Sequence, residues 1–521
     1  MMNIMMNKKE ERLMPKKIVI IGAGISGLSA ACYARMNGYE AEIYEMHDKP
    51  GGLCTSWKRK GYTIDGCIHW LIGSNPNSDF YEIWSELGAV QGRRMLYHDV
   101  FYRYTSSDGR TLVVYCDADK LEAHMKEISP ADSATIELLC RLIRRFAKFK
   151  MPIEKPYELY NFLDIAGLVI KMIPFYKDMN FCNRITIGEF AQRFKDPFLR
   201  EIFPAILWEK DHPLMGLVVA LAELHAEDGG FPQGGSLEFA RAIERRCLNL
   251  GAKIFYKCRA VKILEENGRA VGIQLADGKE IRGDYVISAA DLRTTLYNML
   301  EGKHIDPIHQ ELFQRCKLIP SMVQVSFGVN MDLSSQPECL GECYKASFLK
   351  DWKADWMVVK NYCFDPTLAP PGKSVVVTGF TTDDYQYWEK LADDKDAYRD
   401  EKEKIAAAFA DELDHKYPGF KSAIEVTDVA TPITYVRYTG NWKGTFMTWV
   451  ITPDKVKRFR AIPKTVPGLD NFWISGMWIQ PPGGVSTGAM TSRHIIQMIC
   501  RKDKKRFQTS IPATEDCIGG I

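Results

Sequence analysis

Three glycines near the N-terminus have the spacing of a nucleotide-binding turn. In KKIVIIGAGISGLSAACYARMNGYEAEIYE, residues 16–45, Gly22, Gly24 and Gly27 form the pattern G-x-G-x-x-G. The first glycine permits a tight turn, the second lets the backbone approach a pyrophosphate, and the third lets a helix pack against the preceding strand. Glu45 follows about twenty residues later, where an acid accepts a hydrogen bond from a ribose 2′-hydroxyl. The pattern predicts a dinucleotide site.

The residues around this turn supply the elements that it needs. Residues 18–21 are a short apolar run rich in β-branched side chains, typical of a strand buried on both faces of a parallel sheet. The run ISGLSAACYARMNGY has its apolar residues on one helical face and ends at Gly38, and EAEIYE reads as a second strand. Glycine-rich turns are common, so a purely structural turn is the alternative. The combination of strand, turn, helix, strand and terminal acid favours nucleotide binding.

A glycine doublet, Gly51-Gly52, follows Glu45 closely. An NAD-binding domain has no need of such a doublet. It resembles the doublet of glutathione-reductase-like flavoproteins, which brings backbone N–H groups to the pyrophosphate and ribityl chain of FAD. We therefore predict FAD as the cofactor.

A second glycine-rich segment lies near the other end of the chain, in NFWISGMWIQPPGGVSTGAMTSRHIIQMI. NFWIS reads as a buried strand, Gly476 as a turn against the flavin, and Val485 as the approximate start of a helix. The N-terminus of that helix would direct a partial positive charge at the flavin pyrimidine edge, where negative charge builds on reduction. The two segments are expected to close around one flavin.

These motifs together resemble a known family. The doublet with the following GYTIDGCIHWLIGS, and the stretches 229–291, 431–447 and 467–497, resemble the bacterial-type phytoene desaturases, carotenoid cis–trans isomerases and retinol saturases, and more distantly the flavin amine oxidases. The resemblance runs from Lys16 to about Cys500. It implies an α/β fold in which a Rossmann-like FAD-binding domain of the glutathione-reductase type, with a parallel sheet, is interrupted by a mixed α+β substrate domain that carries a helical, membrane-binding insert.

The resemblance also assigns cofactor contacts, including one from the backbone of Val261 to the adenine. The expected contacts are Gly22, Ala23, Gly24, Ser26, Gly27, Glu45, Lys49, Gly51, Gly52, Leu53, Val261, Gly476, Met477 and Val485. Three positions depart from the family pattern. Met477 stands where many relatives have an acid that binds the ribityl hydroxyls, His47 replaces a frequent arginine, and Cys67 replaces the second glycine after Asp65.

The expected domain order alternates between cofactor-binding and substrate-binding segments. Residues 1–14 are predicted to be a disordered extension and 503–521 a C-terminal tail. The FAD-binding domain is expected in three parts, 15–115, 226–304 and 466–502. The helical, membrane-associating insert is expected over 116–225 and the substrate domain over 305–465.

Composition excludes several classes. The formal charge of +2 gives no electrostatic case for nucleic acid. The N-terminal residues have no apolar core of a signal peptide, and no stretch approaches the ~20 apolar residues of a spanning helix. The fourteen cysteines are scattered, so we expect reduced thiols in a cytoplasmic protein. Cys339 and Cys343 are close-spaced without a second Cys/His pair, so no metal site is predicted.

One segment suggests contact with a membrane. Basic residues interleave with apolar ones over 141–150, and 162–176 is mostly apolar, broken by Asp164 and Lys171. The residues of the basic–aromatic part are Arg141, Leu142, Ile143, Arg144, Arg145, Phe146, Lys148, Phe149 and Lys150. This pattern predicts a monotopic patch that binds anionic membranes, on the inner face of the cell membrane, and admits a lipid. The alternative is a core-packing helix pair with a solvated basic face.

Candidates for catalysis are few. His69 follows the doublet in a segment that relatives place along the substrate side of the flavin, and a histidine near its normal pKa can donate or accept a proton there. A hydrogen-bonded structural histidine is the alternative. Trp70, Arg437, Trp478 and Gln480 are the expected substrate-pocket residues. No catalytic triad is required, because hydride chemistry belongs to the flavin.

The predicted function is an FAD-dependent oxidoreductase that desaturates, saturates or isomerises carbon–carbon bonds of a polyene or isoprenoid lipid such as a carotenoid or retinoid. Quinone, oxygen and a reductase partner are all open as electron acceptors. A second G-x-G-x-x-G on a strand-to-helix turn is absent from the sequence, which disfavours direct reduction by NAD(P)H. A flavin amine oxidase is the alternative, although GMWIQPPGG has no cysteine for covalent flavin attachment. Rab GDP-dissociation inhibitors share the architecture without using FAD, and the intact glycines and Glu45 argue against that class.

Overall fold

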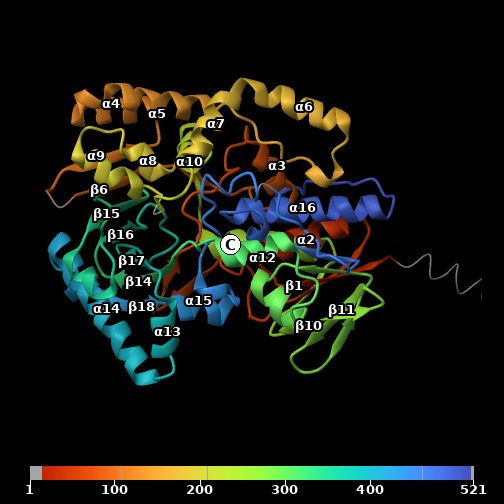
Figure 1. Cartoon of the computed structure of the whole chain (residues 1–521). Helices are drawn as coiled ribbons and strands as arrows, with labels where there is room; N and C mark the ends of the chain where they lie inside the picture. The colour runs from red at the N-terminus through yellow and green to blue at the C-terminus, as the bar shows by residue number, and fades with distance from the viewer. Residues whose placement is uncertain (1–14, 107, 208, 460, 518–521) are drawn as a thin grey trace, which may run out of the picture.

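The computed structural model describes residues 15–106, 108–207, 209–459 and 461–517 (Figure 1). The predicted disordered extension over 1–14 lies outside the described residues.

A five-stranded parallel sheet forms the centre of one half of the molecule. Its strand order is β19 (Phe472–Ile474), β13 (Tyr285–Ser288), β1 (Lys17–Ile21), β2 (Glu40–Tyr44) and β9 (Lys253–Phe255). The central strand β1 is fully buried at Ile18, Val19 and Ile20, as the continuous apolar run predicts for a strand covered on both faces. Segments far apart in the chain therefore meet in this sheet.

Helices cover one face of this sheet and a small sheet lies beyond the other. Helix α2 (Ile25–Met36) packs against α16 (Val485–Lys502) and α11 (Gly235–Asn249), and Figure 1 shows α2 and α16 side by side. The antiparallel strands β10 (Ala260–Glu266), β11 (Arg269–Leu275) and β12 (Glu280–Arg282) form the three-stranded sheet. Separate apolar cores fill the two interfaces.

A seven-stranded mixed sheet forms the second half. Its order is β18 (Ile424–Ala430), β14 (Ser321–Val329), β17 (Ser374–Thr382), β16 (Trp356–Asn361), β15 (Gly341–Lys345), β6 (Val100–Thr105) and β7 (Thr111–Tyr115). Neighbouring strands are antiparallel except β15 and β6, which are parallel. Helices α13 (Tyr385–Leu391) and α14 (Lys395–Lys416) lie on its outer side in Figure 1 and share an apolar core with it. Strands β6 and β7, expected in the first FAD-binding segment, thus belong to this sheet.

A layer of helices lies along the upper edge in Figure 1. It consists of α4 (Ala118–Ile128), α5 (Ser133–Phe146), α6 (Phe162–Met172), α7 (Tyr176–Arg184), α8 (Ile187–Ala191), α9 (Pro197–Ile202) and α10 (Leu214–His225). The remaining elements are β3 (Ser56–Arg59), β4 (Tyr62–Asp65), α3 (Asp79–Glu86), β5 (Met95–Leu96), β8 (Phe231–Pro232), a π-helix (Thr294–Met299), α12 (Pro307–Arg315), α15 (Pro432–Thr439) and α17 (Thr514–Cys517), together with short 3₁₀ turns.

The predicted basic–aromatic membrane patch is wrong for α5. Leu142, Ile143 and Phe146 are buried in the core that α5 shares with α10. Arg144 pairs with Asp119 and Glu122, and the guanidinium of Arg145 lies 2.9 Å from the carboxylate of Asp178. The alternative interpretation of core packing with a solvated basic face therefore fits α5, and the ion pairs on that face are an addition from the structure.

Helix α6 behaves differently. It has no buried residue, and the side chains of Phe162, Leu163 and Ile170 are 82%, 76% and 68% exposed. Among the described residues, no helix is both long and apolar enough to cross a bilayer.

Candidate active site

A cavity of about 1210 Å³ lies between the five-stranded and seven-stranded sheets. Its volume exceeds the range of ~300–1,000 Å³ typical of a site for one small ligand. One end is lined by the glycine turn after β1, the loop after β2 and the start of α16, and the other end by β14, β16, β17 and β18. The space therefore suits a dinucleotide at one end and a second ligand at the other.

The three glycines of the first turn have different roles. Gly22 has a φ of +93°, which side chains rarely adopt, so it permits the turn. Gly24 lines the cavity in an extended conformation, and an added Cβ would meet only the carbonyl oxygen of Gly51, at 3.8 Å. Gly27 does not line the cavity, because its Cβ position lies 1.9 Å from the carbonyl oxygen of Gly22. Gly24 keeps the cavity wall bare, and Gly27 keeps the helix close to the turn.

Glu45 ties the turn to the next loop. Its carboxylate is 7% exposed; Oε2 accepts a 2.6 Å hydrogen bond from the N–H of Ala23, and Oε1 accepts a 2.7 Å bond from the N–H of His47. Each carboxylate oxygen can accept a further bond, and Glu45 lines the cavity. The ribose contact stays a prediction, and the link to Ala23 is a role that sequence reasoning missed.

The glycine doublet and Gly24 together form a stretch of backbone that carries no side chains. Gly51, with a φ of +107°, donates a 2.9 Å hydrogen bond to the carbonyl of Ala23. Gly52 has a φ of +61°, and a Cβ there would lie 3.4 Å from Cα of Gly24. Side chains on these glycines would fill the space between the two turns. Backbone N–H groups without side chains are what a pyrophosphate needs, so these residues fit the predicted FAD.

The second glycine-rich segment, near the C-terminus, brings a second helix N-terminus to the same end of the cavity. Gly476, Gly483 and Gly484 all have positive φ, and Gly484 caps α16. The hydroxyl of Ser492 donates a 2.6 Å hydrogen bond to the carbonyl of Ser26, which fixes α16 against α2. The N-termini of both helices line the cavity, an arrangement that favours a ligand carrying negative charge.

Most other predicted residues also line this cavity. They are Ser26, Lys49, Leu53, His69, Trp70, Arg437, Met477, Trp478 and Val485. Gln480 is exposed at the end of a short turn and does not line it. Val261 also does not, because its side chain points outward from β10 and is 39% exposed; its neighbours Arg259 and Ala260 line the cavity instead.

His69 has an altered acidity. Burial lowers the pKa of its imidazole well below the usual value, and the nearby amine of Lys360 lowers it further. A histidine with an ordinary pKa, as expected from the sequence, is therefore wrong for this environment. Neutral His69 can accept a proton only weakly and is not a ready proton donor.

Polar groups on the seven-stranded sheet were not found from the sequence. Lys360 on β16 lines the cavity with a side chain that is only 4% exposed, and burial lowers its pKa to about 7. Gln324 on β14 accepts a 3.5 Å hydrogen bond from the hydroxyl of Tyr435 and donates a 3.1 Å bond to Ser326. The sequence feature that could have pointed to Lys360 is a lysine inside the otherwise apolar stretch WMVVK of β16.

Asp65 holds the start of α11. Its carboxylate accepts hydrogen bonds from the N–H of Ser236 at 2.6 Å, the hydroxyl of Ser236 at 2.8 Å and the N–H of Cys67 at 3.3 Å. Burial raises its pKa to about 6 in spite of these donors. Its contacts are those of a structural bridge between β4 and α11.

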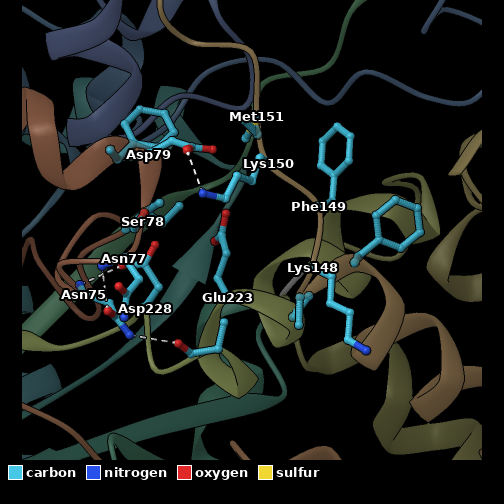
Figure 2. Close-up of a pocket in the computed structure, with 16 residues that line it drawn as sticks. Asn75, Asn77, Ser78, Asp79, Lys148, Phe149, Lys150, Met151, Glu223 and Asp228 are labelled. Carbon is cyan, nitrogen blue, oxygen red and sulfur yellow. Dashed lines mark hydrogen bonds and ion pairs between the residues drawn. The ribbon is translucent and has the colours of Figure 1, made fainter. Parts of the chain in front are cut away.

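A smaller cavity of about 220 Å³ lies under the helical layer (Figure 2). Asp228 accepts hydrogen bonds from the N–H groups of Gly73 and Asn75, and burial raises the pKa of the Glu223 carboxyl well above its usual range. Figure 2 shows Lys150 pointing toward Asp79, and the two charged groups lie 3.9 Å apart. Ile72 forms part of the wall of both cavities, so the two are neighbours.

Within the described ranges, no group of three or more His, Cys, Asp or Glu side chains could hold a metal ion. Cys339 and Cys343 are buried free thiols.

A parallel sheet with two glycine-rich turns at one end of a shared cavity, opposed by a second sheet, defines a two-domain flavoprotein. The chain belongs to the family described as flavin containing amine oxidoreductase, which matches residues 25–496. It is an FAD-dependent oxidoreductase; the predicted family, α/β fold class and cofactor are confirmed, and the membrane-binding insert stays a prediction.

The similar proteins have low sequence identity to this chain, and their alignments cover most of it. The chain is 25% identical to the chloroplastic prolycopene isomerase of Arabidopsis thaliana over 514 residues, 94% of this chain and 84% of that protein. It is 26% identical to the lycopene-forming phytoene desaturase of Pseudescherichia vulneris over 392 residues, 68% and 74% of the two chains. The structure of cyclohexylamine oxidase from Brevibacterium oxydans IH-35A superimposes with a TM-score of 0.62 at 14% identity, covering 94% and 100%, and this likeness concerns the fold alone.

Proposed function

We propose that the protein changes carbon–carbon bonds of a hydrophobic polyene or isoprenoid lipid by desaturation, saturation or isomerisation. The observation that carries the proposal is the continuous cavity, which joins the bare backbone at Gly24, Gly51 and Gly52 to a chamber walled largely by apolar side chains of the seven-stranded sheet. The names of two distant relatives, a prolycopene isomerase and a phytoene desaturase, point to the same class of substrate.

The residues that line the cavity indicate which part of the reaction the cofactor performs and which part the protein performs. Bound FAD supplies hydride exchange at N5 of its isoalloxazine. Gly24, Gly51 and Gly52 would hold its pyrophosphate, and the N-terminus of α16 would face its pyrimidine edge. Met322, Trp356 and Val358 give the opposite end an apolar wall that excludes water and orients a hydrocarbon chain.

The amine oxidase alternative meets an electrostatic objection. An amine substrate is cationic near neutral pH, and the sheet-lined end of the cavity already contains the buried amine of Lys360. Like charges in a buried site repel strongly. The protonated form of Lys360, whose pKa is about 7, therefore disfavours a cationic substrate at this end of the cavity.

An anaerobic redox assay tests this function. The holoprotein is mixed with phytoene or prolycopene in detergent, in both its oxidised and its dithionite-reduced form. We expect a polyene to bleach the 450 nm flavin band, to reoxidise the reduced flavin, or to be isomerised by the reduced form, which distinguishes the three reactions. Adding a quinone or oxygen afterwards identifies the acceptor. Bleaching by cyclohexylamine, with no response to either polyene, would establish the amine oxidase instead.

Membrane contact through α6 belongs to the same proposal, because a water-insoluble substrate must be taken from a lipid phase. Helix α6 and the residues after it present Phe162, Leu163, Ile170, Ile173 and Tyr176 to solvent, each at least 65% exposed. The basic residues of α5 are already paired, so we expect the apolar contact to dominate over attraction to anionic lipid. Peripheral attachment to the inner face of the cell membrane stays a prediction.

Liposome flotation measures this contact. The double variant Phe162→Asp/Ile170→Asp is expected to bind neutral liposomes at least ~10-fold more weakly than the unmodified chain, because each buried apolar side chain contributes about 1.5–3 kcal/mol. Ile511→Asp, at a residue that is 61% exposed elsewhere on the surface, is the control and should float normally. Equal flotation of all three proteins, or flotation only on anionic liposomes, would contradict the assignment to α6.

A further inference from the structure

Lys360 is a buried amine that the proposed hydride chemistry does not use. It lies on β16, which pairs with β15 and β17 in the interior of the seven-stranded sheet. Strand alternation places its side chain on the same face as Trp356 and Val358, and all three line the large cavity. The amine therefore lies in the apolar, sheet-lined end of the cavity.

Within the described ranges, the Nζ of Lys360 has no hydrogen-bond acceptor, although the side chain is only 4% exposed. The Nζ lies over the ring of Tyr102, 5.9 Å from its centroid. Asp65 is the acid that acts on it, but that carboxylate already accepts bonds from Ser236 and Cys67. A buried donor without an acceptor costs about 1–3 kcal/mol, and more when it is charged.

Because Lys360 lines the cavity, a ligand bound there would be in reach to supply the acceptor that the described residues do not provide. A hydrocarbon offers none. An oxygen placed at Lys360 would terminate an apolar chain, because the side chains beside the amine on its own strand are apolar. An anionic oxygen is the best partner, since a charge-assisted hydrogen bond is about twice as strong as a neutral one and also offsets the buried ammonium.

We propose that the cavity takes an apolar polyene or isoprenoid chain that ends in a carboxylate, and that Lys360 donates a hydrogen bond to this carboxylate. The inference rests on the proposed function and narrows its substrate class from hydrocarbons to lipid acids. Lys360 would then set specificity and position the chain along the cavity.

Binding of two matched probes to the holoprotein tests the proposal. The probes are all-trans-retinoic acid and all-trans-retinol, which share one polyene chain and differ at the polar end, and quenching of tryptophan fluorescence reports binding. The unmodified protein is expected to bind the acid at least 10-fold more tightly than the alcohol. Lys360→Met, whose unbranched side chain is one atom shorter and has no amine, is expected to bind both probes equally. Lys402→Met removes another lysine that lines the same cavity, and it should keep the preference for the acid.

Several outcomes would overturn the proposal. Equal binding of the two probes by the unmodified protein does so without any variant, even if Lys360→Met fails to fold. The proposal is also overturned if Lys360→Met still prefers the acid over the alcohol, or if Lys402→Met loses that preference. A changed flavin spectrum in Lys360→Met with an unchanged preference would assign the amine to the flavin. If polyene hydrocarbons react with the flavin while the acid is not preferred, only this inference fails and the proposed function stands.

Discussion

Replacing Gly24 with valine is expected to give a folded protein without the yellow colour of bound FAD. Gly24 has φ −66° and ψ 175°, an extended conformation that valine adopts without strain. The only atom near its Cβ position is the carbonyl oxygen of Gly51, at 3.8 Å, so the new side chain would project into the cavity rather than into the protein. Overpacking of this kind costs about 1–3 kcal/mol, which corresponds to roughly 5- to 150-fold weaker FAD binding.

The measurement is the absorbance at 450 nm per protein chain after dialysis, with circular dichroism and a melting curve as checks on folding. Gly27→Ala, in the same turn, is the matched comparison. Its Cβ would lie 1.9 Å from a backbone oxygen, so this smaller substitution should lower the melting midpoint of the protein. A Gly24→Val protein that retains full FAD occupancy would show that the pyrophosphate does not lie against this turn.

The cofactor-binding half was predictable because its signals are local in sequence. The run at residues 18–21, the glycine turn and the strand ending at Tyr44 each follow from a few adjacent residues, and β1, α2 and β2 form where the pattern predicts. Backbone requirements such as the positive φ of Gly22 and Gly51 leave a trace in the sequence because glycine meets them with least strain. Chain segments that pair over hundreds of residues, such as β13 with β19, were placed by resemblance rather than by pattern.

The substrate half was less predictable because its features depend on tertiary packing. A basic–aromatic pattern is the same whether its arginines face lipid or pair with acids. The acids that pair with Arg144 and Arg145 lie outside the basic run; they are Asp119, Glu122 and Asp178. The burial of Lys360 depends on a sheet assembled from six further strands. Likewise, the lowered pKa of His69 follows from burial and from an amine far away in the sequence. Local patterns do not contain this information.

Replacing Lys360 with methionine is expected to stabilise the ligand-free holoprotein, although most substitutions of buried residues destabilise. Methionine has a similar length and no polar atom, so the variant removes the cost of burying an amine that has no acceptor within the described residues. Breaking a true buried ion pair would have the opposite effect, because it would leave an unpaired charge behind. A rise in stability therefore indicates an unpaired buried amine, and a fall in stability indicates a buried ion pair.

The pH dependence gives the sharper test. Burial lowers the pKa of Lys360 from 10.5 to about 7, so between these values the folded protein binds fewer protons than the unfolded chain, and the stability present at high pH is lost as the pH falls. Methionine does not titrate. The melting midpoint of Lys360→Met should therefore exceed that of the unmodified protein most at about pH 7 and below, by an amount equivalent to roughly 2–4 kcal/mol, and the two should converge near pH 10. Saturating retinoic acid should narrow the difference at neutral pH, because an acid bound at least 10-fold more tightly by the chain with the amine stabilises that chain by at least about 1.4 kcal/mol more than it stabilises the variant. A variant that melts earlier at every pH without ligand would mean that Lys360 is paired within the protein and that the cavity has no amine to offer a ligand.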